Sequence, residues 1–248
     1  GVWPAALTAA ALCALVTGRL RLGHVARGAA IAAKLYPAVL APLTVVYVWR
    51  RQGRREALLC AGLMLAVVAV VFVPFVAVAP GGVWDSLQNQ ASRPLQIESV
   101  GAGVLLVAHN VFGTGVAMET SHGSQNLAGP APEVLAVLQT VLQAAALLAT
   151  WILFARGPAT RERLLYASGA ALVAFIALGK VLSPQFLIWL IPVIPLVAGR
   201  RGLMASAQMA LPVDRRNGAS VARPAPPPGV HAVSEPSPSP AAAMARCR

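Results

Sequence analysis

Apolar runs close to the length of a bilayer crossing recur along the chain and constrain its fold more than any other feature. They cover about residues 2–17, 28–49, 57–79, 133–154, 164–179 and 185–198. A stretch of roughly 20 apolar residues crosses the hydrocarbon core of a membrane as a helix. The chain is 57% hydrophobic and 11% charged, with a mean hydropathy of +0.69, which excludes an ordinary soluble globular domain. The runs therefore predict an all-α fold, a polytopic bundle of transmembrane helices.

Arginine clusters lie at the ends of these apolar runs. The net charge is +12, but the basic residues do not form the single stripe that a nucleic-acid surface needs, so we expect no nucleic-acid partner. The basic segments 50–56, 155–163 and 198–202 match cytoplasmic loops, because such loops carry an excess of Lys and Arg. The same rule places the segments 80–131 and 180–184 outside the membrane.

The composition changes after the last apolar run and divides the chain into two parts. Residues 1–199 form the predicted membrane domain, with 80–131 as a long external loop. Residues 200–248 are basic and rich in Pro, Ser and Ala, without hydrophobic periodicity, which predicts a disordered cytoplasmic tail. The chain is apolar almost from Gly1, and no charged segment precedes the first run. We therefore expect a fragment whose N-terminal part is missing.

The run 28–49 departs from the pattern of a simple crossing. The basic segment 18–27 precedes this run, and the basic segment 50–56 follows it. Lys34, Pro37 and Pro42 interrupt the run. A proline inside a helix costs about 3 kcal/mol, and a central lysine costs about 2.5–3.5 kcal/mol on insertion scales. Two topologies fit: a broken, re-entrant hairpin that returns to the cytoplasm, and a single span kinked at proline. Broken backbone at membrane depth must be buried in protein or line a watery cavity.

Two further segments predict unusual membrane geometry. The runs 164–179 and 185–198 are short, since roughly 16 residues rise only about 24 Å against a ~30 Å hydrocarbon core. The turn "KVLSPQ" at 180–185 should therefore lie recessed below the outer surface, unless it is an ordinary tight turn. In the external loop, "RPLQIESVGAGVLLVAHN" at 93–110 predicts a short interfacial or re-entrant helix with Pro94 in its first turn.

Lysine is rare in this arginine-rich chain, and each lysine lies beside a proline-containing break. Lys34 lies just before Pro37, and Lys180 just before Pro184. A compact ammonium binds phosphate as a point charge, so these two lysines are candidate phosphate ligands. The alternative is that each lysine reaches for the nearest interface and has no ligand.

Polar residues of the short external helix are candidates for binding hydroxyl groups. Glu98 lies at the head of this helix near Gln96, where it either binds a hydroxyl or complements the helix dipole. His109 lies at the other end, and a polar helix end is the simpler interpretation there.

The sequence predicts no metal site. Glu119 and His122 are two possible ligands in one loop, and a zinc site needs at least three. Cys13, Cys60 and Cys247 lie far apart without metal-type spacing. We expect reduced, structural cysteines and no disulfide framework.

Three blocks of sequence contain most of these candidates. They are "AAKLYPAVLAPL" (32–43), "NQASRPLQIES" (89–99) and "SPQFLIWLIPVIPLV" (183–197). Together they resemble bacterial integral-membrane glycosyltransferases of the GT-C superfamily. The match is similar to glycosyltransferase family 87, the polyprenol-phosphate-mannose-dependent mannosyltransferases, over about residues 28–199, the C-terminal part of such an enzyme. The resemblance implies a multi-pass helix bundle of the bacterial plasma membrane with its active site facing outside.

The resemblance also implies a reaction and its partners. A hexose, mannose in the family, moves from a polyprenyl-phosphate donor to a lipid or glycan acceptor, and no cofactor is needed. The general base is an aspartate in the family's first external loop, which is expected upstream of this chain, so the catalytic residues here are unknown. The implied ligands of the donor phosphate are Lys34, Lys180 and Arg93, and those of the sugar or acceptor are Tyr36, Gln96, Glu98, His109, Ser183 and Gln185.

The chain departs from the family at the start of the last block. Many members carry a histidine there, where this chain has Gln185 and Phe186, so the identity of the donor or acceptor stays open. Tyr36 also has a plainer interpretation as an aromatic residue packed beside the break. Two other functions remain in view: a transporter or lipid flippase, which also uses broken helices and buried charge, and a non-catalytic, truncated remnant.

Overall fold

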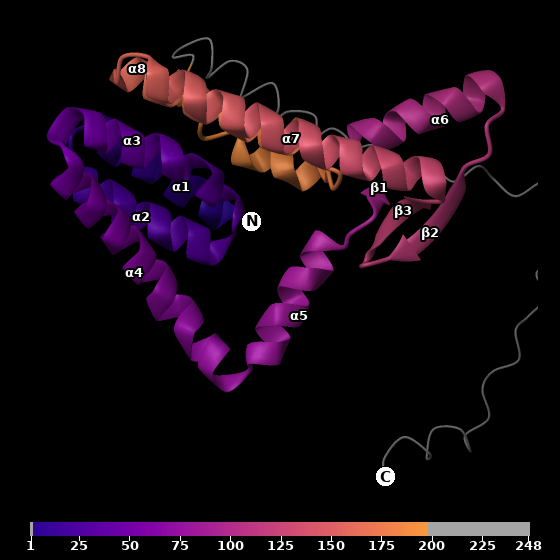
Figure 1. Cartoon of the computed structure of the whole chain (residues 1–248), viewed down its shortest axis with the longest axis horizontal. Helices are drawn as coiled ribbons and strands as arrows, with labels where there is room; N and C mark the ends of the chain where they lie inside the picture. Colours follow the sequence, from indigo (N-terminus) through magenta and orange to yellow (C-terminus); the bar gives the residue numbers. More distant parts are fainter. Residues whose placement is uncertain (1, 198–248) are drawn as a thin grey trace, which may run out of the picture. The chain divides into compact units, whose positions relative to one another are not determined.

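The computed structural model describes residues 2–197 and is mostly helical (Figure 1). The predicted tail at 200–248 and the last residues of the predicted membrane domain lie outside this range. The elements in chain order are α1 (Val2–Val16), α2 (Leu20–Ala33), the 3-10 helix η1 (Tyr36–Leu40), α3 (Ala41–Gln52), α4 (Arg54–Val78), α5 (Pro80–Ala91), β1 (Leu95–Gln96), α6 (Val100–Phe112), β2 (Ala117–Ser121), β3 (Ser124–Ala128), α7 (Pro130–Arg156), α8 (Arg161–Ala177) and the 3-10 helix η2 (Pro184–Trp189).

Two helices within residues 2–197 are long and apolar enough to cross a membrane. They are α4, with 25 residues, and α7, with 27. At 1.5 Å per residue they measure roughly 37 and 40 Å, more than a hydrocarbon core of about 30 Å. Only 11% and 17% of their most apolar stretches are buried, so most of their apolar side chains face outward. By length and composition, both helices suit contact with lipid.

The apolar run 28–49 is not one helix. It breaks at Lys34, whose backbone is extended (φ −165°, ψ 139°), and η1 and α3 follow the break. Arg21, at the start of α2, forms an ion pair of 2.8 Å with Glu56, at the start of α4. The end of α3 also lies beside the start of α4, because Gly53 alone separates the two helices. The chain therefore reverses direction between α2 and α3, as a hairpin does and a single kinked helix does not.

The segment 80–131 contains a small sheet, so the prediction of an all-α fold is wrong here. The strand order is β1-β3-β2, all antiparallel, with Leu95 opposite Leu127 in the β1–β3 pair. The β2–β3 turn is formed by His122 (φ 54°) and Gly123 (φ 69°). A two-residue hairpin turn of this kind needs left-handed backbone at both positions. This local turn chemistry explains why a mostly apolar helical chain forms strands in this segment.

Helix α6 begins later than the sequence predicted. Pro94 precedes β1, so the prediction that it lies in the first turn of the helix is wrong. Ser99 is the N-cap instead, and its hydroxyl accepts a hydrogen bond of 3.2 Å from the N–H of Ala102. This bond satisfies one of the free donors at a helix start. The helix ends at Gly113, whose left-handed backbone (φ 68°) caps it.

The last apolar run, 185–198, is not a regular α-helix. The 3-10 helix η2 is followed by a turn, and residues 194–197 are helical. Pro192 and Pro195 have no backbone N–H, so a continuous helix would lose two hydrogen bonds here. The broken segment still contributes to the core, because Trp189 and Val193 are buried.

The main core lies where α1, η1, α3, α7, α8 and η2 meet. A second, smaller core lies between the sheet, α6 and the start of α7. The largest fully buried apolar side chains of the main core are Leu12, Leu15, Leu40, Leu43, Tyr47, Leu164 and Leu172.

Helix α2 packs closely against α4 at a glycine. A Cβ atom on Gly28 would lie 2.6 Å from the carbonyl oxygen of Met64 and 2.8 Å from the Cβ of Val67. Both distances are shorter than van der Waals contact, and backbone atoms cannot easily move away. The close packing of the hairpin against α4 therefore depends on the missing side chain of Gly28.

We predict that Gly28→Ala destabilises the protein by about 1–3 kcal/mol, because the added methyl group overpacks this contact. Gly62→Ala in α4 is the matched control, since a Cβ there meets nothing within 4 Å. The control should raise stability by up to about 1 kcal/mol, because alanine favours a helix interior. Equilibrium unfolding of both variants in detergent micelles measures the difference, and equal effects at the two glycines would contradict this packing.

Candidate functional site

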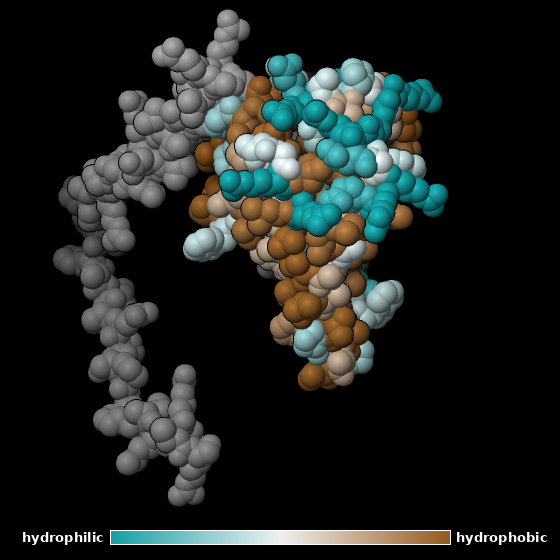
Figure 2. All heavy atoms as spheres, turned by 90° about the vertical axis from the view of Figure 1, so that its left-hand side faces the viewer, coloured by the Kyte–Doolittle hydropathy of each residue, from teal (hydrophilic) through white to brown (hydrophobic). Residues whose placement is uncertain are grey.

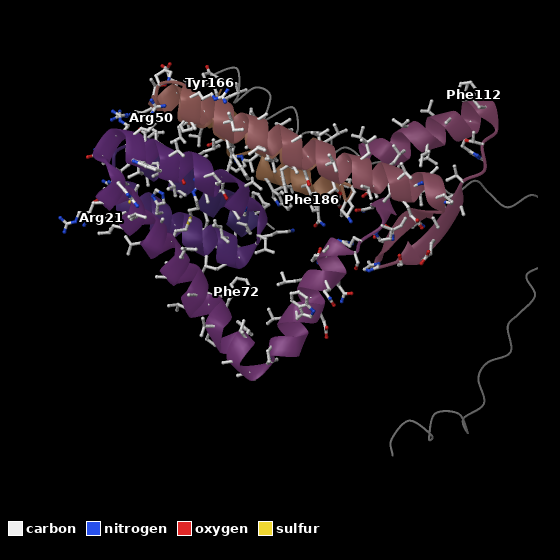
Figure 3. All side chains as sticks on the ribbon, viewed as in Figure 1. Arg21, Arg50, Phe72, Phe112, Tyr166 and Phe186 are labelled. Atoms are coloured by element: carbon white, nitrogen blue, oxygen red, sulfur yellow. The ribbon has the colours of Figure 1, made fainter. Side chains whose placement is uncertain are left out.

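A cavity of about 520 Å³ lies beside the break in the run 28–49. Its lining includes two cations, Lys34 and Arg93, and no acidic residue. The side chains of Phe72, on α4, and Phe186, on η2, lie on its wall and are marked in Figure 3. The remaining lining residues are mostly apolar or neutral: Ile31, Ala32, Ala33, Leu35, Tyr36, Ser86, Gln90, Gln143, Phe175, Gly179, Val181 and Trp189. This lining suits a ligand that joins an anionic group to an apolar body.

Three stacked aromatic side chains form one wall of the cavity. The rings of Tyr36 and Trp189 are 4.0 Å apart at an interplanar angle of 2°, and those of Phe186 and Trp189 are 4.3 Å apart at 21°. Stacked aromatic pairs contribute about 0.5–1.5 kcal/mol beyond their burial. The hydroxyl of Tyr36 lies 3.3 Å from that of Thr8 on α1. Tyr36 therefore both packs beside the break, as its plainer interpretation predicted, and lines the cavity.

Lys34 lies against this aromatic wall. Its Nζ atom is 4.7 Å from the ring centre of Trp189 and 5.4 Å from that of Phe186. The negative face of an aromatic ring attracts a cation but does not neutralise its charge. Lys34 has no acidic partner among residues 2–197. Its ammonium therefore lies against the aromatic rings without an acidic partner in the described range.

Arg93 enters the cavity from the segment between α5 and β1. Its Nη2 atom donates to the carbonyl oxygen of His122 at 3.1 Å and to the hydroxyl of Ser124 at 3.4 Å. Both acceptors belong to the β2–β3 hairpin, so the sheet positions this guanidinium. The bonds that Arg93 makes within the described range use Nη2 alone, which leaves its other N–H groups for an anion.

Lys180 is held outside the cavity lining. Its Nζ donates to the carbonyl oxygen of Ala91 at 2.8 Å, and its own carbonyl oxygen accepts from the N–H of Gln96 at 3.0 Å. Partial burial lowers the pKa of Lys180, because desolvation penalises the charged form. The neighbouring residues Gly179 and Val181 do line the cavity. Lys180 thus connects the turn 180–185 to α5 and β1, and it reaches the cavity only through its neighbours.

The remaining candidates from the sequence lie outside the lining of this cavity. The amide of Gln96 donates to the carboxylate of Glu98 at 3.0 Å, with Gln96 buried and Glu98 exposed. His109 is exposed near the end of α6 and contacts the carbonyl oxygen of Thr114. The structure does not bring these candidates together with Lys34: Gln96, Glu98, His109, Ser183 and Gln185.

Two glutamines on α7, which the sequence analysis did not single out, help to build the cavity. Gln143 lines it, and its amide donates to the carbonyl oxygen of Phe175 in the last turn of α8. One turn earlier, Gln139 donates to the carbonyl oxygen of Gly179 at 3.4 Å and accepts from the N–H of Gly101 at 3.2 Å. Carbonyl groups at a helix end lack partners within the helix. The spacing "LQTVLQ" in an apolar run was the available signal, because residues four apart share a helix face.

A buried guanidinium without a partner lies on α2. Arg27 is fully buried, and within the described range its three nitrogen atoms have no hydrogen-bond acceptor. The Nε2 atom of His24, one turn earlier on the same face, is also buried without a hydrogen-bond partner among the described residues. Arg27, the last residue of the basic segment 18–27, is therefore buried inside the protein. The close contacts of Gly23 with α1 and of Gly28 with α4 turn this face of α2 toward the interior.

The described residues contain no group of three or more His, Cys, Asp or Glu side chains that could hold a metal ion. Cys13 and Cys60 are free thiols, and Cys247 lies outside the described range. Comparison of the chain with protein-family models, with curated proteins and with solved structures gave no match. A functional assignment therefore depends on the residues and geometry described above.

We predict that Arg27→Met increases stability by about 1–4 kcal/mol, because methionine fills a similar volume without an unpaired buried charge. Arg19→Met, at the exposed position just before α2, should change stability by no more than about 0.5 kcal/mol. Denaturant unfolding of the two variants measures the difference. Destabilisation by Arg27→Met would mean that the guanidinium has a partner in the folded protein.

Proposed function

We propose that the chain is part of a membrane glycosyltransferase that uses a polyprenyl-phosphate sugar as donor. The transferred sugar is a hexose such as mannose, and the acceptor is a lipid or glycan at the outer face of the membrane. The observation that carries the proposal is the cavity, which combines Lys34 and Arg93 with aromatic and apolar walls and contains no acid. A polyprenyl-phosphate sugar has matching parts, since a phosphate joins an apolar chain to a sugar ring.

The geometry suggests how these residues would act on such a donor. Lys34 and Arg93 would bind the phosphate, and fixed positive charge stabilises the anion that develops as the glycosidic bond to phosphate breaks. The exposed faces of the aromatic stack offer a surface for the sugar ring or the first isoprene units. No carboxylate or histidine lines the cavity, so the proposal takes the general base from outside these lining residues.

The proposed membrane topology follows from the arrangement of the charged ends. The arginine-rich ends of α2, α3, α4 and α7 lie together, since Arg21 pairs with Glu56 and Arg50 donates to the carbonyl oxygens of Ala155 and Gly157 (Figure 3). This end would face the cytoplasm, by the positive-inside rule. In this topology α4 and α7 cross the membrane, and α2, η1 and α3 form a re-entrant hairpin.

A second candidate function is lipid transport or flipping. The absence of a carboxylate or histidine from the cavity lining favours it, because such a site can bind a lipid phosphate without a general base. A non-catalytic remnant of a transferase would show the same lining. Binding and transfer therefore need separate measurements.

We predict that Lys34→Gln and Arg93→Gln each weaken binding of a polyprenyl-phosphate sugar by roughly 10–100-fold, the loss of one charged hydrogen bond. Native mass spectrometry of the purified protein with the donor measures this loss. Arg55→Gln, which removes one exposed charge at the other end of α4, is the matched control and should leave binding unchanged. Undiminished binding to both variants would mean that the cavity is not the donor site.

Transfer is tested on the same variants in membranes. Labelled donor should pass its sugar to an endogenous lipid or glycan, and Lys34→Gln should reduce the rate in proportion to its loss of binding. Donor that binds and crosses proteoliposome membranes without sugar transfer would identify a flippase. Donor that binds with neither transfer nor crossing would identify the remnant.

The topology predicts which positions reagents reach from each side of the membrane. In a background without other cysteines, Leu22→Cys, which replaces a side chain 54% exposed, should be labelled only from the cytoplasmic side. Arg55→Cys should behave in the same way, and Glu119→Cys should be labelled only from outside. A membrane-impermeant maleimide on intact cells and on inverted vesicles makes this measurement. Labelling of Leu22→Cys from outside would exclude the re-entrant hairpin.

A further inference from the structure

Arginine side chains from three separate chain segments gather at one end of the molecule. They come from the start of α2, from the α3–α4 connection and from the α7–α8 connection. Figure 2 looks onto this end and shows hydrophilic side chains gathered over its upper part, with a mostly apolar surface below. The boundary between charged and apolar surface therefore lies next to these arginines.

Only some of these arginine side chains form hydrogen bonds or ion pairs within the protein. Arg51 makes one hydrogen bond of 2.9 Å to the hydroxyl of Tyr47 and lies over the ring of that tyrosine. The side chain of Arg161 has no hydrogen bond or ion pair to residues 2–197. Three others have partners within the protein. Arg21 pairs with Glu56, and Arg50 donates to the carbonyl oxygens of Ala155 and Gly157. Arg163 donates to the carbonyl oxygens of Leu153 and Pro158.

Arg51 and Arg161 face the same two adjoining hollows. Arg51 belongs to the last turn of α3, and Arg161 is the first residue of α8, so the tertiary fold brings them together. The smaller hollow, of about 80 Å³, also has the wall residues Leu15, Leu20 and Tyr47 and no acid. The wider one, of about 590 Å³, lies over the α7–α8 connection and includes Glu162. Two guanidinium groups on a shared hollow form a typical site for a phosphate group.

The surroundings of the hollow favour a lipid over a free phosphate ion. Leu20, which is partly exposed, adds an apolar side chain to its lining. Trp49, just before the arginines of α3, is 54% exposed, as expected of a tryptophan at a membrane interface. Leu58, on the first turns of the adjoining helix α4, is 62% exposed. A ligand that carries both a phosphate and acyl chains would contact both kinds of surface.

We propose that Arg51 and Arg161 bind the phosphate of an anionic phospholipid headgroup at this end of the molecule. The site is separate from the cavity with Lys34 and does not depend on glycosyl transfer. The bound phosphate bridges the end of α3 and the start of α8, which belong to different parts of the helix bundle. It therefore holds the hairpin of α2 and α3 against the α7–α8 pair.

The experiment compares lipid binding to the full chain and to two double variants with the same change in charge. Native mass spectrometry measures binding of phosphatidylglycerol relative to phosphatidylcholine with identical acyl chains, at an ionic strength where the Debye length is about 8 Å. Arg51→Gln/Arg161→Gln should lower the preference for phosphatidylglycerol roughly tenfold. Arg54→Gln/Arg55→Gln, on exposed arginines of the same end that line neither hollow, should lower it less than about twofold.

The other outcomes overturn the proposal. An equal loss in both double variants would show diffuse attraction of lipid to the whole arginine-rich end, and an unchanged preference would show that these two arginines bind no lipid. Inorganic phosphate that displaces phosphatidylglycerol at millimolar concentration would assign the site to a soluble anion. If Arg51→Gln/Arg161→Gln does not fold, Arg161→Gln alone, an exposed position, should lower the preference about threefold with an unchanged Tm.

Discussion

The stack of Tyr36 on Trp189 is the contact on which the candidate site depends. It joins η1, the segment after the break at Lys34, to η2, the segment after the turn 180–185. Both segments are short 3-10 helices beside prolines, and neither has a long hydrogen-bonded ladder to hold it in place. The stacked rings therefore supply the rigidity that the backbone lacks. They also form the surface over which the Lys34 ammonium lies.

Helix ends in an apolar environment need partners for their carbonyl groups, and this requirement shapes the rest of the site. Gln143 of α7 donates to a carbonyl group in the last turn of α8, Gln139 donates to that of Gly179, two residues after α8, and Lys180 donates to that of the last residue of α5. Each bond joins elements that lie far apart in the sequence. An unsatisfied polar group in a lipid-like environment costs several kcal/mol. The polar side chains near the cavity are therefore mostly structural, which leaves Lys34 and part of Arg93 for a ligand.

The basic residues of the chain fall into three environments with different consequences. The arginines at the ends of α2, α3, α4 and α7 are mostly exposed, where a positive charge needs little support. Lys34 is partly buried against aromatic rings, which hold an ammonium but do not neutralise it. Arg27 is fully buried without a partner among residues 2–197, and its burial opposes folding. Net charge alone would treat all of these residues as equivalent.

The sequence alone determined the features that rest on local composition. The apolar runs of α4 and α7 and the basic segments at their ends follow from residue types in sequence order, whereas for residues 28–49 the sequence left a broken hairpin and a kinked single span both open. It also singled out Lys34, Tyr36 and Arg93, which share one cavity. Only the tertiary structure decided that Lys180 bonds Ala91 outside that cavity, that Arg27 is buried and that the strands β1, β2 and β3 pair as a sheet. The physical reason is that these outcomes depend on which distant backbone carbonyls, glycines and strands come into contact, and side-chain type at a single position does not specify that.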